Sequence, residues 1–100
     1  MIRHIVMWKI KDEAEGMGKE EIMAKISADL LALKDKIPVV RGVEVSPSLT
    51  RGDMCYDMGL IVSLEKLEDL PLYANHPEHL KVRAFISKVR TERVTADIRV

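Results

Sequence analysis

Residues that can transfer protons gather in the segment LPLYANHPEHLKV, which runs from Leu70 to Val82. This segment contains Tyr73, His76 and His79, and Pro77 directly follows the first histidine. Proline fixes its own φ and holds the residue before it in an extended conformation, so a helix is expected to begin at Pro77. His76 is therefore interpreted as a boundary residue near solvent.

His79 lies two residues inside the predicted helix. Its spacing of i, i+3, i+7 and i+10 puts it on one face with the apolar residues Val82, Ile86 and Val89, so we expect it to point inward. Burial and the positive end of the helix dipole both favour a neutral imidazole there. A neutral imidazole near pH 7 is what a general base requires, and Tyr73, on a short helix just before, is placed to reach the same space.

A third histidine, His4, comes from the amino-terminal end of the chain. Residues 2–11 are rich in Ile, Val, Met and Trp and predict a strand whose even positions carry His4. If that even face meets the helices, His4 points into the same interior as His79. The predicted catalytic residues are His79, Tyr73 and His4. The predicted ligand-binding residues are Val6, Trp8, Val82 and Ile86. A filled core, in which a backbone carbonyl satisfies each histidine, is the alternative.

The two histidines of HPEH do not form a recognisable metal motif. The zinc helix has the pattern HExxH, and Pro77 interrupts the helical continuity that this pattern needs. Glu78 is expected to face solvent. The chain also contains no CxxC, no P-loop and no GxGxxG. We predict no metal site and no cofactor.

The composition limits the class of protein. One hundred residues, 47% of them hydrophobic, suffice for one core, so a single domain over residues 1–100 is predicted. Lys plus Arg and Asp plus Glu number 16 each, so no net charge attracts nucleic acid or an anionic membrane. No stretch approaches the roughly 20 apolar residues of a membrane span, and the first apolar run is too short for a signal peptide. With the lone Cys55, these features predict a cytoplasmic protein.

The remaining segments must position these side chains. Apolar residues recur at helical spacing from Lys19 to Ile37, and Pro38 ends that helix. Loops are expected over residues 12–18 and 47–55. The other predicted elements are strands over 39–46 and 56–64, a short helix over 68–75, a helix from 77 to about 91, and a strand over 93–100. The order β-α-β-β-α-β predicts a ferredoxin-like α+β fold, with a four-stranded antiparallel sheet and helices on one face.

The first strand is apolar on both of its faces. Its even positions can meet the helices, but Ile5 and Met7 on the odd face would then be left without a cover. A homodimer in which the two open sheet faces meet would cover them. We therefore expect the chain itself to be its macromolecular partner, in addition to a small-molecule ligand.

The opening RHIVMWKIKDE and the segment EDLPLYANHPEHLKV resemble the stress-responsive A/B barrel (Dabb) family. The resemblance covers nearly the whole chain, including the last strand with Asp97. It implies ferredoxin-like subunits that pair through their sheets as a dimeric α+β barrel. One plant member is the polyketide cyclase that forms olivetolic acid by a cofactor-independent aldol cyclisation. By resemblance, its base matches His79, its tyrosine Tyr73, and its strand-one histidine His4.

Two departures from the cyclase leave the function open. The cyclase lines its pocket with several aromatic residues, whereas this chain has four in total, and Trp8 stands where a smaller aliphatic would leave room. The leading hypothesis is a dimer that binds a small apolar or carbonyl-containing molecule. The second is a cyclase, isomerase or lyase in which His79 removes a proton next to a carbonyl, while Tyr73 and His4 bind the enolate oxygen. The third is a structural dimer whose histidines belong to the core.

Overall fold

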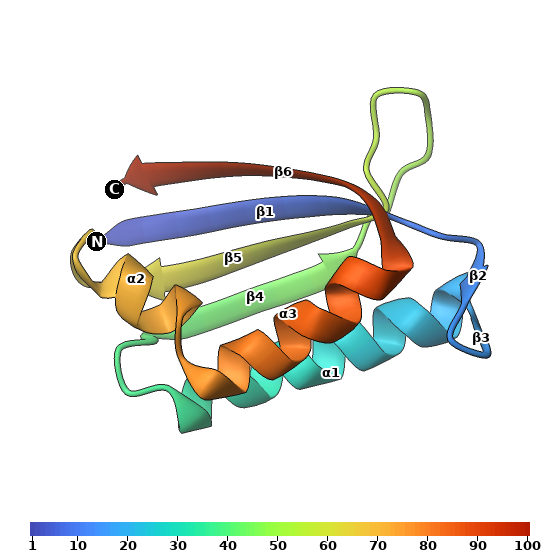
Figure 1. Ribbon diagram of the computed structural model, residues 1–100. Helices are drawn as coiled ribbons and strands as arrows, with labels where there is room; N and C mark the ends of the chain where they lie inside the picture. Colours follow the sequence, from blue (N-terminus) through green and yellow to red (C-terminus); the bar gives the residue numbers. More distant parts are fainter.

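The sheet is built around the first strand, β1 (Ile2–Ile10), in a computed structural model that describes residues 1–100. Strand β1 pairs antiparallel with β5 (Met58–Leu64) on one side and with β6 (Arg90–Arg99) on the other. Strand β4 (Gly42–Pro47) extends the sheet beyond β5, so the order is β4-β5-β1-β6 (Figure 1). This topology confirms the predicted ferredoxin-like α+β fold.

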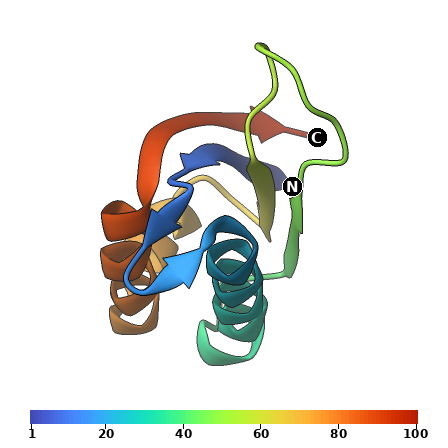
Figure 2. The ribbon, with the colours of Figure 1, turned by 90° about the vertical axis from the view of Figure 1, so that its right-hand side faces the viewer.

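Helices cover one face of this sheet and leave the other face bare (Figure 2). Helix α1 (Lys19–Lys36) and helix α3 (Pro77–Val89) lie side by side, and the short helix α2 (Asp69–Ala74) precedes α3. No helix is both long and apolar enough to cross a membrane. The buried residues of α1 recur at helical spacing, as the sequence predicts: Ile22, Met23, Ile26, Leu30 and Leu33.

The core lies between the sheet and the helices. All even positions of β1 are buried there, including His4, Val6 and Trp8, and so are the even positions of β5. This confirms that the even face of the first strand meets the helices. Because side chains alternate across a strand, Ile5 and Met7 lie on the bare face.

Several predicted boundaries were wrong. The expected loop over 12–18 contains a small hairpin, formed by β2 (Glu13–Ala14) and β3 (Met17–Gly18). The predicted helix to residue 91 ends at Val89, because the chain turns extended at Arg90 and pairs with Ile10 of β1. Strand pairing therefore outweighs local helical pattern at this junction.

Strand β6 presents its polar side to the helices and its apolar side to the bare face. The register with β1 places Asp97 opposite His4 and Val94 opposite Met7. Residues directly opposite each other lie on the same face of a sheet, so Asp97 shares the helix side with His4. Large apolar side chains are left exposed on the bare face: Met7 is 41%, Val94 37% and Ile98 42% exposed.

Candidate functional site

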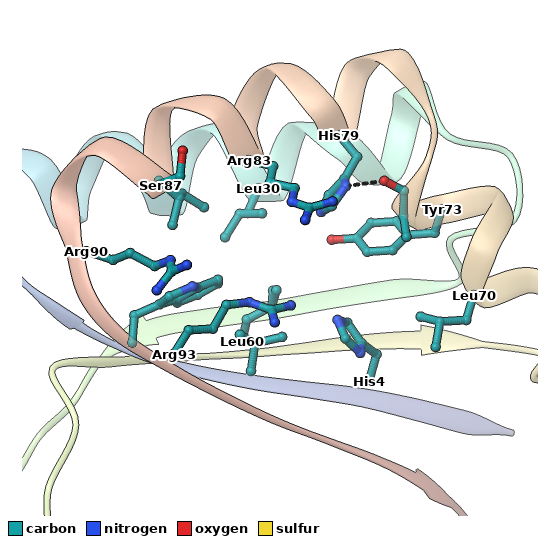
Figure 3. A pocket seen from close by; sticks show the side chains of 14 residues that line it. His4, Leu30, Leu60, Leu70, Tyr73, His79, Arg83, Ser87, Arg90 and Arg93 are labelled. Atoms are coloured by element: carbon teal, nitrogen blue, oxygen red, sulfur yellow. Dashed lines mark hydrogen bonds between the residues drawn. The ribbon is translucent and has the colours of Figure 1, made fainter.

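A cavity of about 320 Å³ lies between the sheet and helices α2 and α3, and 14 residues line it (Figure 3). Six of the seven predicted site residues are among them: His4, Val6, Trp8, Tyr73, His79 and Ile86. Trp8 is buried in the wall and does not fill the space. The filled core that the sequence left open is therefore not what the structure contains.

The turn between α2 and α3 gives the two histidines of HPEH different surroundings. His76 is extended, with φ −65° and ψ 136°, and its Nδ1 accepts a hydrogen bond from the backbone N–H of Glu78 at 3.1 Å. It is therefore the N-cap of α3, which satisfies a backbone donor that the first turn would otherwise leave free. Three positions later, His79 is half-buried and faces the cavity.

The imidazole of His79 is held in one tautomer. Its Nδ1 lies 2.8 Å from the carbonyl oxygen of Ala74, and a carbonyl only accepts, so Nδ1–H is the donor. In the neutral ring Nε2 is then an unprotonated acceptor. Burial lowers the pKa of His79 below its ordinary value, and the positive charges of Arg83 and Arg93 lower it further, against the opposing effect of the Ala74 hydrogen bond.

Tyr73 brings a buried hydroxyl group next to this imidazole. Its side chain is 1% exposed, and its hydroxyl has no hydrogen-bond partner in the protein. The ring centroids of Tyr73 and His79 are 4.4 Å apart, and the hydroxyl points into the cavity (Figure 3). Burial raises the pKa of Tyr73 to about 12, so at neutral pH the group is an O–H donor.

His4 completes the polar part of the cavity from the sheet. Its Nδ1 lies 2.6 Å from Oδ1 of Asp97, and a carboxylate only accepts, so Nδ1 carries the proton. The ring centroids of His4 and Tyr73 are 6.1 Å apart. Asp97 thus fixes the orientation of His4, as a carboxylate does for a histidine in many active sites. Asp97 belongs to the segment that resembles the Dabb family, but that resemblance did not predict its contact with His4.

Val82, the seventh predicted site residue and one of those predicted to bind a ligand, lies apart from the other six. Val82 is buried in the core but does not line the cavity. It lies on the side of α3 that also carries Glu78 and Phe85, and both of these contact α1: Glu78 pairs with Lys36, and Phe85 packs under Lys25. The stripe shared with His79 is wide enough for one edge to face α1 and the other to face the cavity.

Eight lining residues were not predicted: Leu30, Leu60, Leu70, Ala74, Arg83, Ser87, Arg90 and Arg93. The arginines matter most, since basic residues are ordinarily assigned to the solvent face. A signal for Arg83 was present, because it lies at i+4 from His79 and shares its helix face. Arg93 is four residues before Asp97 on the same strand, and because side chains alternate between the two faces, both lie on one face. No group of three or more His, Cys, Asp or Glu side chains is placed to hold a metal ion.

Comparisons with known proteins agree with this fold. A structure of a dimeric protein of unknown function and ferredoxin-like fold from Bacteroides fragilis superposes with a TM-score of 0.85 and 27% identity, over 99% of this chain and 95% of that one. A hydroxynitrile lyase from Passiflora edulis shares the fold at a TM-score of 0.80, with 15% identity over 97% of this chain and 90% of the lyase.

Sequence comparison identifies the family. An uncharacterized protein of Streptomyces coelicolor is 30% identical over 81 residues, which cover 79% of each chain. Residues 2–100 match the family model of the stress responsive A/B barrel domain. The chain therefore belongs to the stress-responsive A/B barrel (Dabb) family.

Proposed function

We propose that the protein is a homodimeric enzyme that binds a small carbonyl compound in this cavity and removes a proton from the carbon next to the carbonyl group. The observation that carries the proposal is the neutral, oriented imidazole of His79 beside the unpartnered hydroxyl of Tyr73. The two groups supply the base and the hydrogen-bond donor that enolate formation requires.

His79 has the properties of a general base. Nδ1–H donates a hydrogen bond to the Ala74 carbonyl, so Nε2 is the nitrogen that accepts a proton from substrate. The lowered pKa keeps the ring neutral at pH 7. Proton transfer to Nε2 breaks the carbon–hydrogen bond, and its electron pair moves to the carbonyl oxygen as an enolate. In an isomerisation the same imidazolium returns the proton to a carbon of the enolate. In an aldol-type reaction the enolate carbon instead bonds to a second carbonyl carbon, and the imidazolium protonates the alkoxide oxygen that forms there.

Tyr73 and His4 would stabilise the enolate oxygen. A donor in a dry site is worth far more than one in water, and the Tyr73 hydroxyl is both buried and free of other partners. His4 is oriented by Asp97, which accepts the Nδ1–H hydrogen bond, so His4 donates a second hydrogen bond, from Nε2 to the enolate oxygen, only as the imidazolium.

The size and lining of the cavity favour a small ligand. Ligand sites typically enclose roughly 300–1,000 Å³, and this one, at about 320 Å³, is at the low end. The walls are largely apolar, with Val6, Trp8 and Ile86 among them. The cavity therefore suits an aromatic or short-chain carbonyl compound better than a long ketide.

A purely structural role for these residues accounts less well for Tyr73. A buried hydroxyl without a partner costs roughly 1–3 kcal/mol, and a core residue would be expected to find one. Trp8, another residue that lines the cavity, likewise has an indole Nε1 that is buried without a partner. Two unsatisfied donors around one cavity favour a polar ligand group between them.

A homodimer through the bare sheet face is supported by the residues exposed there. Met7, Val94 and Ile98 together form an apolar surface on β1 and β6, of the kind that marks an interface. The ferredoxin-like protein from Bacteroides fragilis is described as dimeric. The cavity lies on the opposite, helix-covered side, so dimerisation leaves its lining residues in place.

Hydrogen–deuterium exchange at carbon tests the proposed reaction directly. Small methyl ketones and 1,3-dicarbonyl compounds are incubated with the protein in D₂O, and loss of the α-hydrogen signal is followed by proton NMR. We expect the wild type to accelerate exchange of at least one compound, and His79→Gln to lose about 100-fold or more of that rate. His76→Gln is the matched control and should retain it. Equal rates for wild type and His79→Gln would reject the base assignment.

A further inference from the structure

Three arginines from different parts of the chain converge on this cavity. Arg83 lies on α3, Arg90 at the junction of α3 and β6, and Arg93 on β6, and all three line the space in front of His79 (Figure 3). None of their guanidinium groups forms a hydrogen bond or an ion pair with another residue of the chain. They are thus three positive charges without an ion-pair partner, although the negative charge of Asp97 partly opposes the lowering of the Arg93 pKa by burial.

The only carboxylate on the same side of β6 is already engaged. Asp97 accepts the 2.6 Å hydrogen bond from His4, while Glu92, the nearest acidic neighbour along the strand, pairs with Lys9 at 3.3 Å. Burial, together with the positive charges of Arg90 and Arg83, lowers the pKa of Arg93. Like charges held this close destabilise each other unless an anion joins them.

Building on the proposed function, we infer that the ligand is an organic carboxylate. Its anionic group pairs with Arg83, Arg90 and Arg93, and its carbonyl-bearing, largely apolar body extends toward Tyr73 and His79. Guanidinium groups match carboxylates because two parallel N–H donors meet two oxygens, and such charge-assisted bonds are stronger than neutral ones. Arg83 and Arg93 are exposed and Arg90 is half-buried, so the arginines form the solvent side of the cavity, whereas Tyr73 is buried.

In this arrangement different residues bind the two ends of the ligand. The arginines select for charge and hold the carboxylate at the solvent side. The buried donors and the base then meet a carbonyl group placed deeper in the cavity. Fixing one end of a small molecule in this way also orients the other end for reaction.

Matched pairs of anionic and neutral probes test the inference. The pairs are 4-acetylbenzoate with 4-acetylbenzamide, and 4-oxopentanoate with 4-oxopentanamide, so that shape is kept while charge is changed. Trp8 is the only tryptophan and borders the cavity, so its fluorescence reports occupancy. The histidine NMR signals give an independent reading.

We expect each carboxylate to bind about tenfold or more tightly than its amide, since charge-assisted hydrogen bonds contribute more than neutral ones. The double variant Arg83→Gln/Arg93→Gln should weaken carboxylate binding about tenfold or more and leave amide binding unchanged. Both positions are exposed, so the fold should survive the change. Arg51→Gln, in the exposed loop beyond β4, is the control and should bind like the wild type.

The outcomes separate this inference from the function on which it rests. If amides bind as tightly as carboxylates, or if the double variant binds carboxylates normally, the anion site is wrong while the carbonyl-binding cavity stands. If none of the four probes changes the Trp8 fluorescence or the His79 signals, both the anion site and the ligand-binding cavity are wrong.

Discussion

The two histidines of HPEH are three positions apart and have unrelated roles. His76 caps the helix by accepting from the Glu78 backbone, whereas His79 donates to the Ala74 carbonyl and faces the cavity. Both depend on Pro77, which forces the residue before it to be extended and starts the helix. One proline thus assigns one histidine to structure and the other to the site.

The lowered pKa of His79 predicts how the exchange rate and the folding stability change with pH. NMR titration should give His79 a midpoint below its ordinary value of 6.5, because burial and the nearby Arg83, His4 and Arg93 disfavour the imidazolium. The rate of hydrogen–deuterium exchange at the α-carbon should be constant near neutral pH and should fall as the pH drops through that midpoint. Folding stability should follow the same direction, since the unfolded chain takes up the proton first. A midpoint above 6.5 would contradict the assignment.

Replacing Tyr73 with phenylalanine should separate function from stability. The change removes a buried hydroxyl that has no partner, so the free energy of unfolding should stay the same or rise by up to about 1 kcal/mol. Exchange at carbon should fall about 100-fold, as when an oxyanion donor is lost. Urea unfolding measures the first effect and proton NMR the second. Marked destabilisation would instead indicate that the hydroxyl supports the fold.

Helix α3 and strand β6 show how single elements divide their faces between packing and chemistry. One edge of the α3 stripe, with Val82, meets α1, while the edge with His79 and Arg83 meets the cavity. On β6 the polar residues Arg93 and Asp97 face inward and the apolar ones outward, the reverse of an ordinary surface strand. Such a reversal exposes apolar side chains on the bare face, which the proposed second subunit would cover.

The N-cap residue of α3, His76, is expected to contribute to the stability of the protein. His76→Ala should lower the free energy of unfolding by about 1 kcal/mol, because the Glu78 N–H loses its acceptor. His76→Asn should restore most of that loss, since asparagine is among the best N-caps. Urea denaturation of the three proteins provides the measurement. Equal stability of His76→Ala and wild type would show that the cap contributes nothing.

In the molecule as a whole, helices cover one face of the sheet and leave the other face bare (Figure 2). The loop between β4 and β5 stands on the bare side and carries two nearly fully exposed apolar residues, Leu49 at 95% and Met54 at 94%. Met54 and Met7 line one hollow beside this loop, and Leu49 and Val94 are further apolar side chains exposed to solvent in the single chain. A second copy is the partner that would cover these side chains.

Light scattering should therefore give a mass of two chains of 11.4 kDa each. Met7→Glu should yield monomers, because an unpaired charge buried in the interface costs several kcal/mol. Leu31→Glu, on the outer side of α1 where leucine is 51% exposed, is the control and should remain dimeric. A monomeric wild type at micromolar concentration would reject the dimer.

Much of this protein is determined by the sequence alone. Alternation in residues 2–10, helical spacing from Lys19 onward and the break at Pro77 set the elements, their order and the inward direction of His4 and His79. These are local properties, since the period of apolar residues and the restrictions of proline act within a few positions. They sufficed for the fold and for the placement of six of the seven candidate residues around the cavity.

The tertiary structure alone decided the rest. Strand pairing chose which face of β6 turns inward, and so brought Asp97 to His4 and Arg93 to the cavity. It also decided that space remains beside Trp8 and that Val82 faces α1 instead. Pairing register, tautomer and empty volume arise from contacts between residues far apart in the chain, and no local pattern encodes them.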